Sequence, residues 1–177
     1  MKIQARLVAF PRINVILSIV FVFLLSGCAG PRIAEDLLVN TERLAAPKIE
    51  NGYIINTEIN PKIGNYEGID TSVKQSLIIA LKEANIFGGD KNRPYTISAN
   101  IEIASQAAMS FGNFEGKLQV KYTVYDENNN RLLEKTIYTE AGSDQWFFVG
   151  AKRHRRARAV NIAKNVLEFT DYLKSQL

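Results

Sequence analysis

The chain has 177 residues, of which 22 are Lys or Arg and 18 are Asp or Glu, for a formal net charge of +4. Its content of 46% hydrophobic and 23% charged residues is typical of a globular protein with a core and excludes a wholly disordered chain. The single cysteine excludes a disulfide-held fold and a zinc site built from several thiolates.

The first 27 residues have the pattern of an export signal. Three basic residues, Lys2, Arg6 and Arg12, precede a strongly apolar run at residues 15–25. A transmembrane helix needs about 20 apolar residues, and this run is much shorter. The pattern therefore predicts a signal peptide over residues 1–27 and not a permanent membrane span.

The residues that follow define the type of signal. Leu25-Ser26-Gly27-Cys28 resembles the lipobox of bacterial lipoproteins. The resemblance implies that Cys28 becomes the first mature residue and carries a diacylglycerol and an N-acyl chain; no other cofactor is predicted. In the lipoproteins that the sequence resembles, an aspartate directly after the cysteine implies retention in the inner membrane. This chain has Ala29 at that position. By resemblance, the protein is expected in the periplasmic leaflet of the outer membrane.

Loss of the signal removes three basic residues and no acidic ones, so the mature net charge falls to +1. A nearly neutral mature protein gives no support for general nucleic-acid binding. Residues 28–47 are expected to form a lipidated tether with a short amphipathic helix at residues 35–44. Residues 48–177 are expected to form a single periplasmic domain.

The first half of this domain predicts a strand and then a helix. Residues 53–59 are β-type and precede Pro61 and Gly64, as in an edge strand that ends in a turn. Ser72-Val73-Lys74-Gln75 has the spacing of a capping box, and Gly88-Gly89 is expected to end the helix. The apolar face of this helix is predicted to hold Val73, Leu77, Ala80, Leu81 and Ala84.

The second half predicts three strands and a long helix. Alternation of apolar and polar residues predicts two strands, whose buried positions would be Tyr95, Ile97, Ala99, Ile101 and Ile103, and then Leu118, Val120, Tyr122 and Val124. A polar turn at residues 126–130 predicts a hairpin with a return strand at residues 132–139, whose buried face stays ambiguous. The C-terminal segment predicts a helix with an apolar stripe of Ala159, Ile162, Ala163, Val166, Phe169, Thr170 and Leu173.

These elements predict an α+β fold of two layers, in which two helices pack on one face of a mainly antiparallel sheet of about four strands. Behind a lipidated cysteine, this outline resembles small periplasmic α+β accessory lipoproteins, such as lipopolysaccharide-assembly lipoproteins, activators of penicillin-binding proteins and auxiliary lipoproteins of transport systems. The resemblance is architectural only, so it transfers no binding residue to this chain.

Catalytic and metal-binding patterns are sparse. His154 is the only histidine and is surrounded by Lys and Arg with no carboxylate nearby in the sequence to orient it. A hydrolase that uses His154 therefore stays a minor alternative, no catalytic residue is assigned, and no metal site is predicted.

An aromatic and basic segment precedes the C-terminal helix and extends into it. Its residues form a candidate site for a protein partner or anionic lipid: Trp146, Phe147, Phe148, Lys152, Arg153, Arg155, Arg156 and Arg158. Residues 151–177 hold seven basic and two acidic residues, so the mature chain is strongly dipolar. The aromatic residues could instead fasten the helix to the core while the cations form a solvated, partly salt-bridged turn. A second candidate surface is the segment 107–114, with Met109, Phe111 and Phe114.

Together these patterns predict a membrane-anchored lipoprotein that acts as a noncatalytic binding or accessory component of the cell envelope. Its expected partner is an envelope protein or an anionic glycolipid. The alternatives are a carrier of lipid or lipopolysaccharide and the hydrolase.

Overall fold

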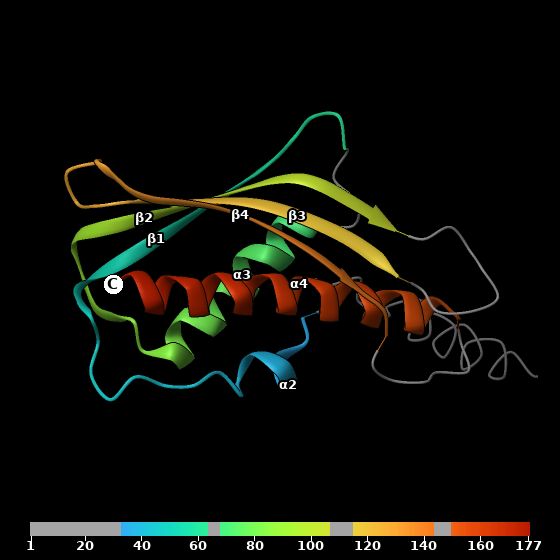
Figure 1. Cartoon of the computed structure of the whole chain (residues 1–177), viewed down its shortest axis with the longest axis horizontal. Coiled ribbons are helices and arrows are strands. Elements are labelled where there is room, and N and C mark those ends of the chain that lie inside the picture. Colours follow the sequence, from blue (N-terminus) through green and yellow to red (C-terminus); the bar gives the residue numbers. More distant parts are fainter. Residues whose placement is uncertain (1–32, 64–67, 107–114, 144–149) are drawn as a thin grey trace, which may run out of the picture. The chain divides into compact units, whose positions relative to one another are not determined.

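The computed structural model describes residues 33–63, 68–106, 115–143 and 150–177, all within one compact unit, Pro31–Leu177. The predicted lipobox, the aromatic residues 146–148 and the segment 107–114 lie outside the described residues. In chain order the described elements are α2 (Glu35–Leu38), β1 (Ile49–Ile59), α3 (Ile69–Ala84), β2 (Phe87–Gln106), β3 (Gly116–Tyr125), β4 (Arg131–Ala141) and α4 (Gly150–Gln176) (Figure 1).

The described strands form a four-stranded sheet in the order β1-β2-β3-β4. Strands β2, β3 and β4 pair antiparallel, whereas β1 pairs parallel to β2. The α+β class and a sheet of four strands are confirmed; the sheet is mixed, because one of its three strand pairings is parallel. The reason lies in α3, which connects β1 to β2 and returns the chain to the starting end of the sheet, as a parallel pair requires.

Helix α3 has the predicted apolar face but different ends. It begins after Gly68, which has a left-handed backbone, and Ser72 lies inside the helix with its hydroxyl donating to the Gly68 carbonyl. The predicted capping box at Ser72 is therefore wrong. The helix ends at Ala84 and is followed by Asn85, another left-handed residue, so Gly88-Gly89 does not end it and belongs to β2 instead.

Strand β2 keeps the predicted alternation only as far as Ile101. Ile97, Ala99 and Ile101 are fully buried, but a bulge shifts the pairing with β3 between Ile101 and Ile103. An extra residue in one strand inverts the phase of the side chains beyond it. Ile103 is consequently 40% exposed, and its predicted burial is wrong.

The predicted hairpin joins β3 to β4. The Asp126 carboxylate accepts hydrogen bonds from the backbone amides of Asn128 and Asn130, and Asn129 takes the left-handed conformation that closes the turn. In the return strand, Ile137 and Ala141 are buried while Leu132 and Tyr138 are exposed, which resolves the ambiguity about its buried face.

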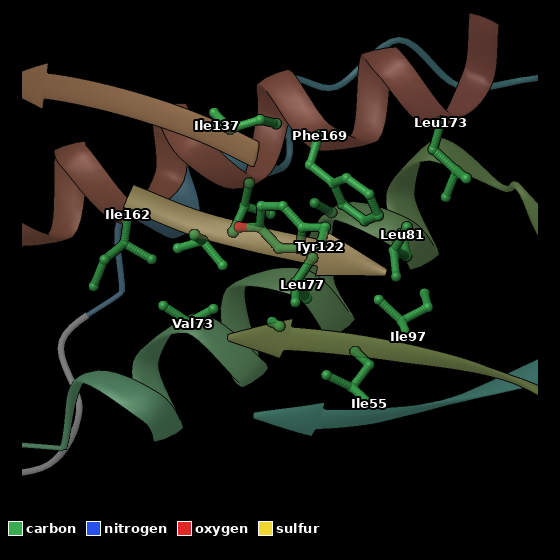
Figure 2. Close-up of a cluster of buried hydrophobic side chains, with 14 of the residues drawn as sticks. Ile55, Val73, Leu77, Leu81, Ile97, Tyr122, Ile137, Ile162, Phe169 and Leu173 are labelled. Atoms are coloured by element: carbon green, nitrogen blue, oxygen red, sulfur yellow. The ribbon is translucent and has the colours of Figure 1, made fainter. Parts of the chain in front are cut away.

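Helices α3 and α4 cover the same face of the sheet, as Figure 1 shows. Every residue of the stripe predicted for the C-terminal helix is buried. Figure 2 shows the layer between helices and sheet, where Tyr122 of β3 stacks on Phe169 of α4 with ring centroids 4.1 Å apart. The aromatic pair fixes α4 over the centre of the sheet.

Residues 34–48, most of which were expected in the tether, pack along the helices. Ala34 and Leu38 have no exposed surface, and the predicted short helix is a single turn, α2. Farther on, the Leu44 amide donates to the Ala84 carbonyl at the end of α3. Ala34, six residues after Cys28 in the sequence, therefore already belongs to the packed domain.

Candidate functional site

The basic residues predicted as a partner or lipid site lie in the first turns of α4. They are Lys152, Arg153, Arg155, Arg156 and Arg158, here called the basic cluster. Lys152 is exposed and the four arginines are of intermediate exposure. Because residues three and four apart share a helix face, Lys152, Arg155 and Arg156 lie together on one side of α4. Three of the five cations therefore share one side of the helix.

Arg156 forms a bidentate ion pair with Asp36 of α2. Its two guanidinium nitrogens donate to the two carboxylate oxygens over 2.8 and 2.6 Å. The Arg156 side chain is only 13% exposed, whereas that of Asp36 is 54% exposed. The hydrogen bond from Arg156 lowers the pKa of Asp36 below its usual value. One predicted site residue thus holds α2 against α4.

Sequence patterns did not identify Asp36 as part of the site. It lies 120 residues before Arg156, and a single carboxylate in a polar segment gives no sign of its partner. The acidic first turn of α2 was the only local signal.

The two ends of α4 both have nearby cations, which suit the helix dipole at the C-terminal end but not at the N-terminal end. The partial negative charge at a helix C-terminus favours cations, and Lys48 donates from its ammonium to the Lys174 carbonyl over 2.7 Å. At the N-terminus the dipole favours acids, yet the first turn of α4 holds no acid and two cations, Lys152 and Arg153. The stability of the helix therefore does not explain why cations lie at the N-terminal end of α4.

Beside the basic cluster, α4 is fastened to the sheet by buried amides that the sequence analysis missed. The Tyr122 hydroxyl donates to the Asn165 side-chain oxygen over 2.8 Å, and the Asn165 amide donates to the Ile137 carbonyl and the Thr139 hydroxyl. One helical turn earlier, Asn161 donates to the Gly116 carbonyl over 2.7 Å. Asparagines spaced by four residues within an apolar stripe were the available signal. They fix the register of α4 on the sheet, and with it the position of the basic cluster.

The opposite face of the sheet is polar and carries ion pairs between neighbouring strands. Lys121 pairs with Glu134 over 3.1 Å and Lys117 with Glu140 over 3.4 Å. Ion pairs between adjacent strands are typical of a sheet face that is exposed to solvent.

The two edges of the sheet differ. Edge strand β4 carries Arg131, Glu134, Lys135 and Glu140 and has a register shift near Leu132. Edge strand β1 contains no Lys, Arg or Pro, and its Ile54 is 46% exposed. Charged side chains, prolines and bulges are the usual protections against pairing at a sheet edge, and the regular part of β1 after Tyr53 has only Glu58.

Within the described residues, no group of three or more His, Cys, Asp or Glu side chains is arranged to hold a metal ion. His154 lies in α4 between Arg153 and Arg155 with intermediate exposure. No helix in this part of the chain combines the length and the apolar character needed to cross a bilayer.

No family model matches the chain, and no curated protein matches its sequence. Solved structures match its fold. The protein XCC0632 from Xanthomonas campestris, of the DUF330 family, superposes with a TM-score of 0.58 over 83% of this chain and 98% of its own, at 10% identity. The hypothetical protein CT253 from Chlamydia trachomatis superposes with a TM-score of 0.50 over 71% and 97%, at 8% identity.

A minor lipoprotein from Acinetobacter baumannii gives a TM-score of 0.46 over 68% of this chain and 91% of its own, at 11% identity, which is too loose to carry an argument. At such identities the two better matches show the fold alone. The described α+β domain is therefore a recurrent bacterial architecture, and any function must be argued from the residues of this chain.

Proposed function

We propose that the protein is a lipoprotein of the bacterial envelope, anchored by acyl chains on Cys28, that acts without catalysis as a binding or accessory component. The observation that carries the proposal is the small number of residues between the lipobox cysteine and the first buried residue of the domain. Cys28 ends the lipobox-like sequence Leu25-Ser26-Gly27-Cys28, and Ala34, only six residues later, is completely buried. Six residues span at most about 20 Å, so the anchor would hold the domain directly at the membrane.

The anchor is tested by metabolic labelling with a clickable fatty acid followed by membrane fractionation. The wild-type chain should be labelled and sediment with the membranes, and Cys28→Ala should lose both properties. An unlabelled wild-type chain, or a labelled Cys28→Ala variant, would refute acylation at this residue.

The outer membrane is part of the proposal because Ala29 follows the cysteine. Density-gradient separation of the two membranes should place the wild-type chain in the outer-membrane fraction and Ala29→Asp in the inner-membrane fraction. Identical distributions of the two proteins would contradict sorting by this residue.

The proposed accessory role requires a surface for an envelope protein, and edge strand β1, which has few protections against pairing after Tyr53, fits this role. A peptide strand can add to a free sheet edge through backbone hydrogen bonds. A photo-crosslinking residue at Asn56 of β1 should capture a defined partner in membranes. The same residue at Thr136 of edge strand β4, which is also exposed, is the matched control. Equal capture at both positions, or none at either, would count against docking at β1.

The lipid-carrier alternative has less support from the described residues. A carrier of this architecture would hold acyl chains between the sheet and the helices. That layer is filled by side chains with no exposed surface, including Tyr122, Phe169 and Leu77. The hydrolase alternative depends on His154, and an activity that survived His154→Ala would eliminate it.

A further inference from the structure

We propose that the basic cluster at the start of α4 is the membrane-facing end of the domain and binds the phosphate groups of anionic phospholipids. This inference rests on the proposed acylation of Cys28. The acyl anchor alone does not determine how the domain is oriented at the membrane or which lipids it binds. The inference specifies both.

The Asp36 to Arg156 ion pair provides the first step. Arg156 lies six residues after Gly150, the first residue of α4, which corresponds to about 9 Å along the helix axis. It lies 20 residues before Gln176, or about 30 Å from the other end of the helix. Asp36 therefore holds α2 near the basic end of α4.

The length of the tether provides the second step. The chain from Ala34 back to Cys28 reaches at most about 20 Å, which is less than the distance from Arg156 to the C-terminal end of α4. An anchor of this length keeps the basic end of α4 closer to the bilayer than the C-terminal end. The domain would thus meet the membrane with one end preferred.

The charge of this end provides the third step. Arg156 is committed to Asp36, but Lys152 and Arg155 lie beside it on the same face of α4, and Lys152 is exposed. Lys152 and Arg155 thus add two positive charges next to the Asp36 to Arg156 ion pair. Each Lys or Arg near an anionic leaflet contributes favourably to binding, and this attraction would offset the unfavourable position of the cations in the helix dipole.

The orientation can be measured with probes at the two ends of the same helix. Ala151 and Gln176 are both exposed, and acylation of Cys28 leaves an introduced cysteine as the only free thiol. Acylated Ala151→Cys and Gln176→Cys proteins would be labelled with a fluorophore and reconstituted into vesicles that contain a headgroup-attached quencher. The vesicles would be phosphatidylethanolamine with or without phosphatidylglycerol. We expect strong quenching at residue 151, weak quenching at residue 176, and a difference that requires phosphatidylglycerol.

Charge removal tests the residues. In the Ala151→Cys background, Lys152→Gln together with Arg155→Gln should reduce the ratio of docked to undocked molecules roughly 30-fold, because each cation contributes about one factor of five at an anionic surface. Lys164→Gln is the matched control, since Lys164 is an exposed cation farther along α4. Asp36→Asn should reduce the difference between the two probes by releasing α2 from Arg156.

The outcomes separate the inference from the proposed function. If the chain remains in the membrane but both probes are quenched equally, or if phosphatidylglycerol or the double variant has no effect, the inference is overturned and the anchor stands. If the wild-type chain does not associate with membranes more than Cys28→Ala does, both are overturned.

Discussion

Asn165 has no exposed surface, yet its side chain joins three elements of the domain: α4 to β3 through Tyr122 and to β4 through Ile137 and Thr139. Replacement by leucine keeps the branching of the side chain but leaves the Tyr122 hydroxyl buried without its acceptor. An unsatisfied buried polar group costs about 1–3 kcal/mol. We therefore expect Asn165→Leu to lower the free energy of unfolding by that amount, as measured by urea denaturation.

The pair can be separated from general core damage by a double-mutant cycle. Tyr122→Phe combined with Asn165→Leu should cost less than the sum of the single substitutions, because the second substitution removes the orphaned partner. Thr136→Val on the exposed face of β4 should change the free energy of unfolding by less than about 0.5 kcal/mol. Strict additivity of the two single effects would show that the hydroxyl and the amide act independently.

Asp36 gives a prediction about pH. Its carboxyl pKa is lowered in the folded protein, chiefly by the hydrogen bond from Arg156, so the pair stabilises the fold above the ordinary carboxyl pKa near 4 and loses this effect as the pH falls through the lowered value. Asp36 is half exposed, so the gain should stay below about 1 kcal/mol. The stability difference between wild type and Asp36→Asn, measured by urea denaturation, should be present at pH 6 and shrink progressively as the pH falls below 4. A difference that is constant over this range would contradict the assigned role of the carboxylate.

At the scale of elements, the contact between β1 and the start of β2 depends on Gly88. A Cβ atom at this position would lie 2.8 Å from the Glu50 carbonyl oxygen, too close to be accommodated without moving the backbone of β1. Overpacking of this kind costs about 1–3 kcal/mol. We expect Gly88→Ala to lower the melting temperature and to increase hydrogen exchange selectively in β1. Ser105→Ala, at an exposed position of the same strand, is the control and should leave both unchanged.

The elements also show what the sequence could predict. The apolar faces of α3 and α4 and the alternation of β3 were correct, because their periods follow from the local geometry of a helix or strand. The exposure of Ile103 was not predictable from alternation, because the bulge before it exists only where β2 pairs with β3. The parallel pairing of β1 likewise depends on the path of the chain through α3.

The same distinction applies to the candidate site. Its cations were visible as a local run in the sequence, so Arg156 could be named in advance. Its partner Asp36 could not, because the ion pair is formed by the docking of α2 against α4 and no local pattern encodes a contact over 120 residues. Local composition thus predicted the charge of the site, whereas tertiary contacts determine which of its cations are committed to the fold.

At the scale of the whole molecule, the proposed orientation depends on the short chain between the anchor and Ala34. Insertion of 20 Gly and Ser residues after Gly30 would add a flexible segment with an average span of about 25 Å, which exceeds the reach of the native tether. The longer linker lowers the effective concentration of the basic cluster at the bilayer. We expect the acylated variant to remain in the membrane while quenching of a probe at residue 151 falls towards that at residue 176. The same insertion after Asn129, in the turn between β3 and β4, leaves the tether unchanged and should preserve the difference between the probes. Undiminished quenching at residue 151 with the longer tether would show that tether length does not set the orientation of the domain.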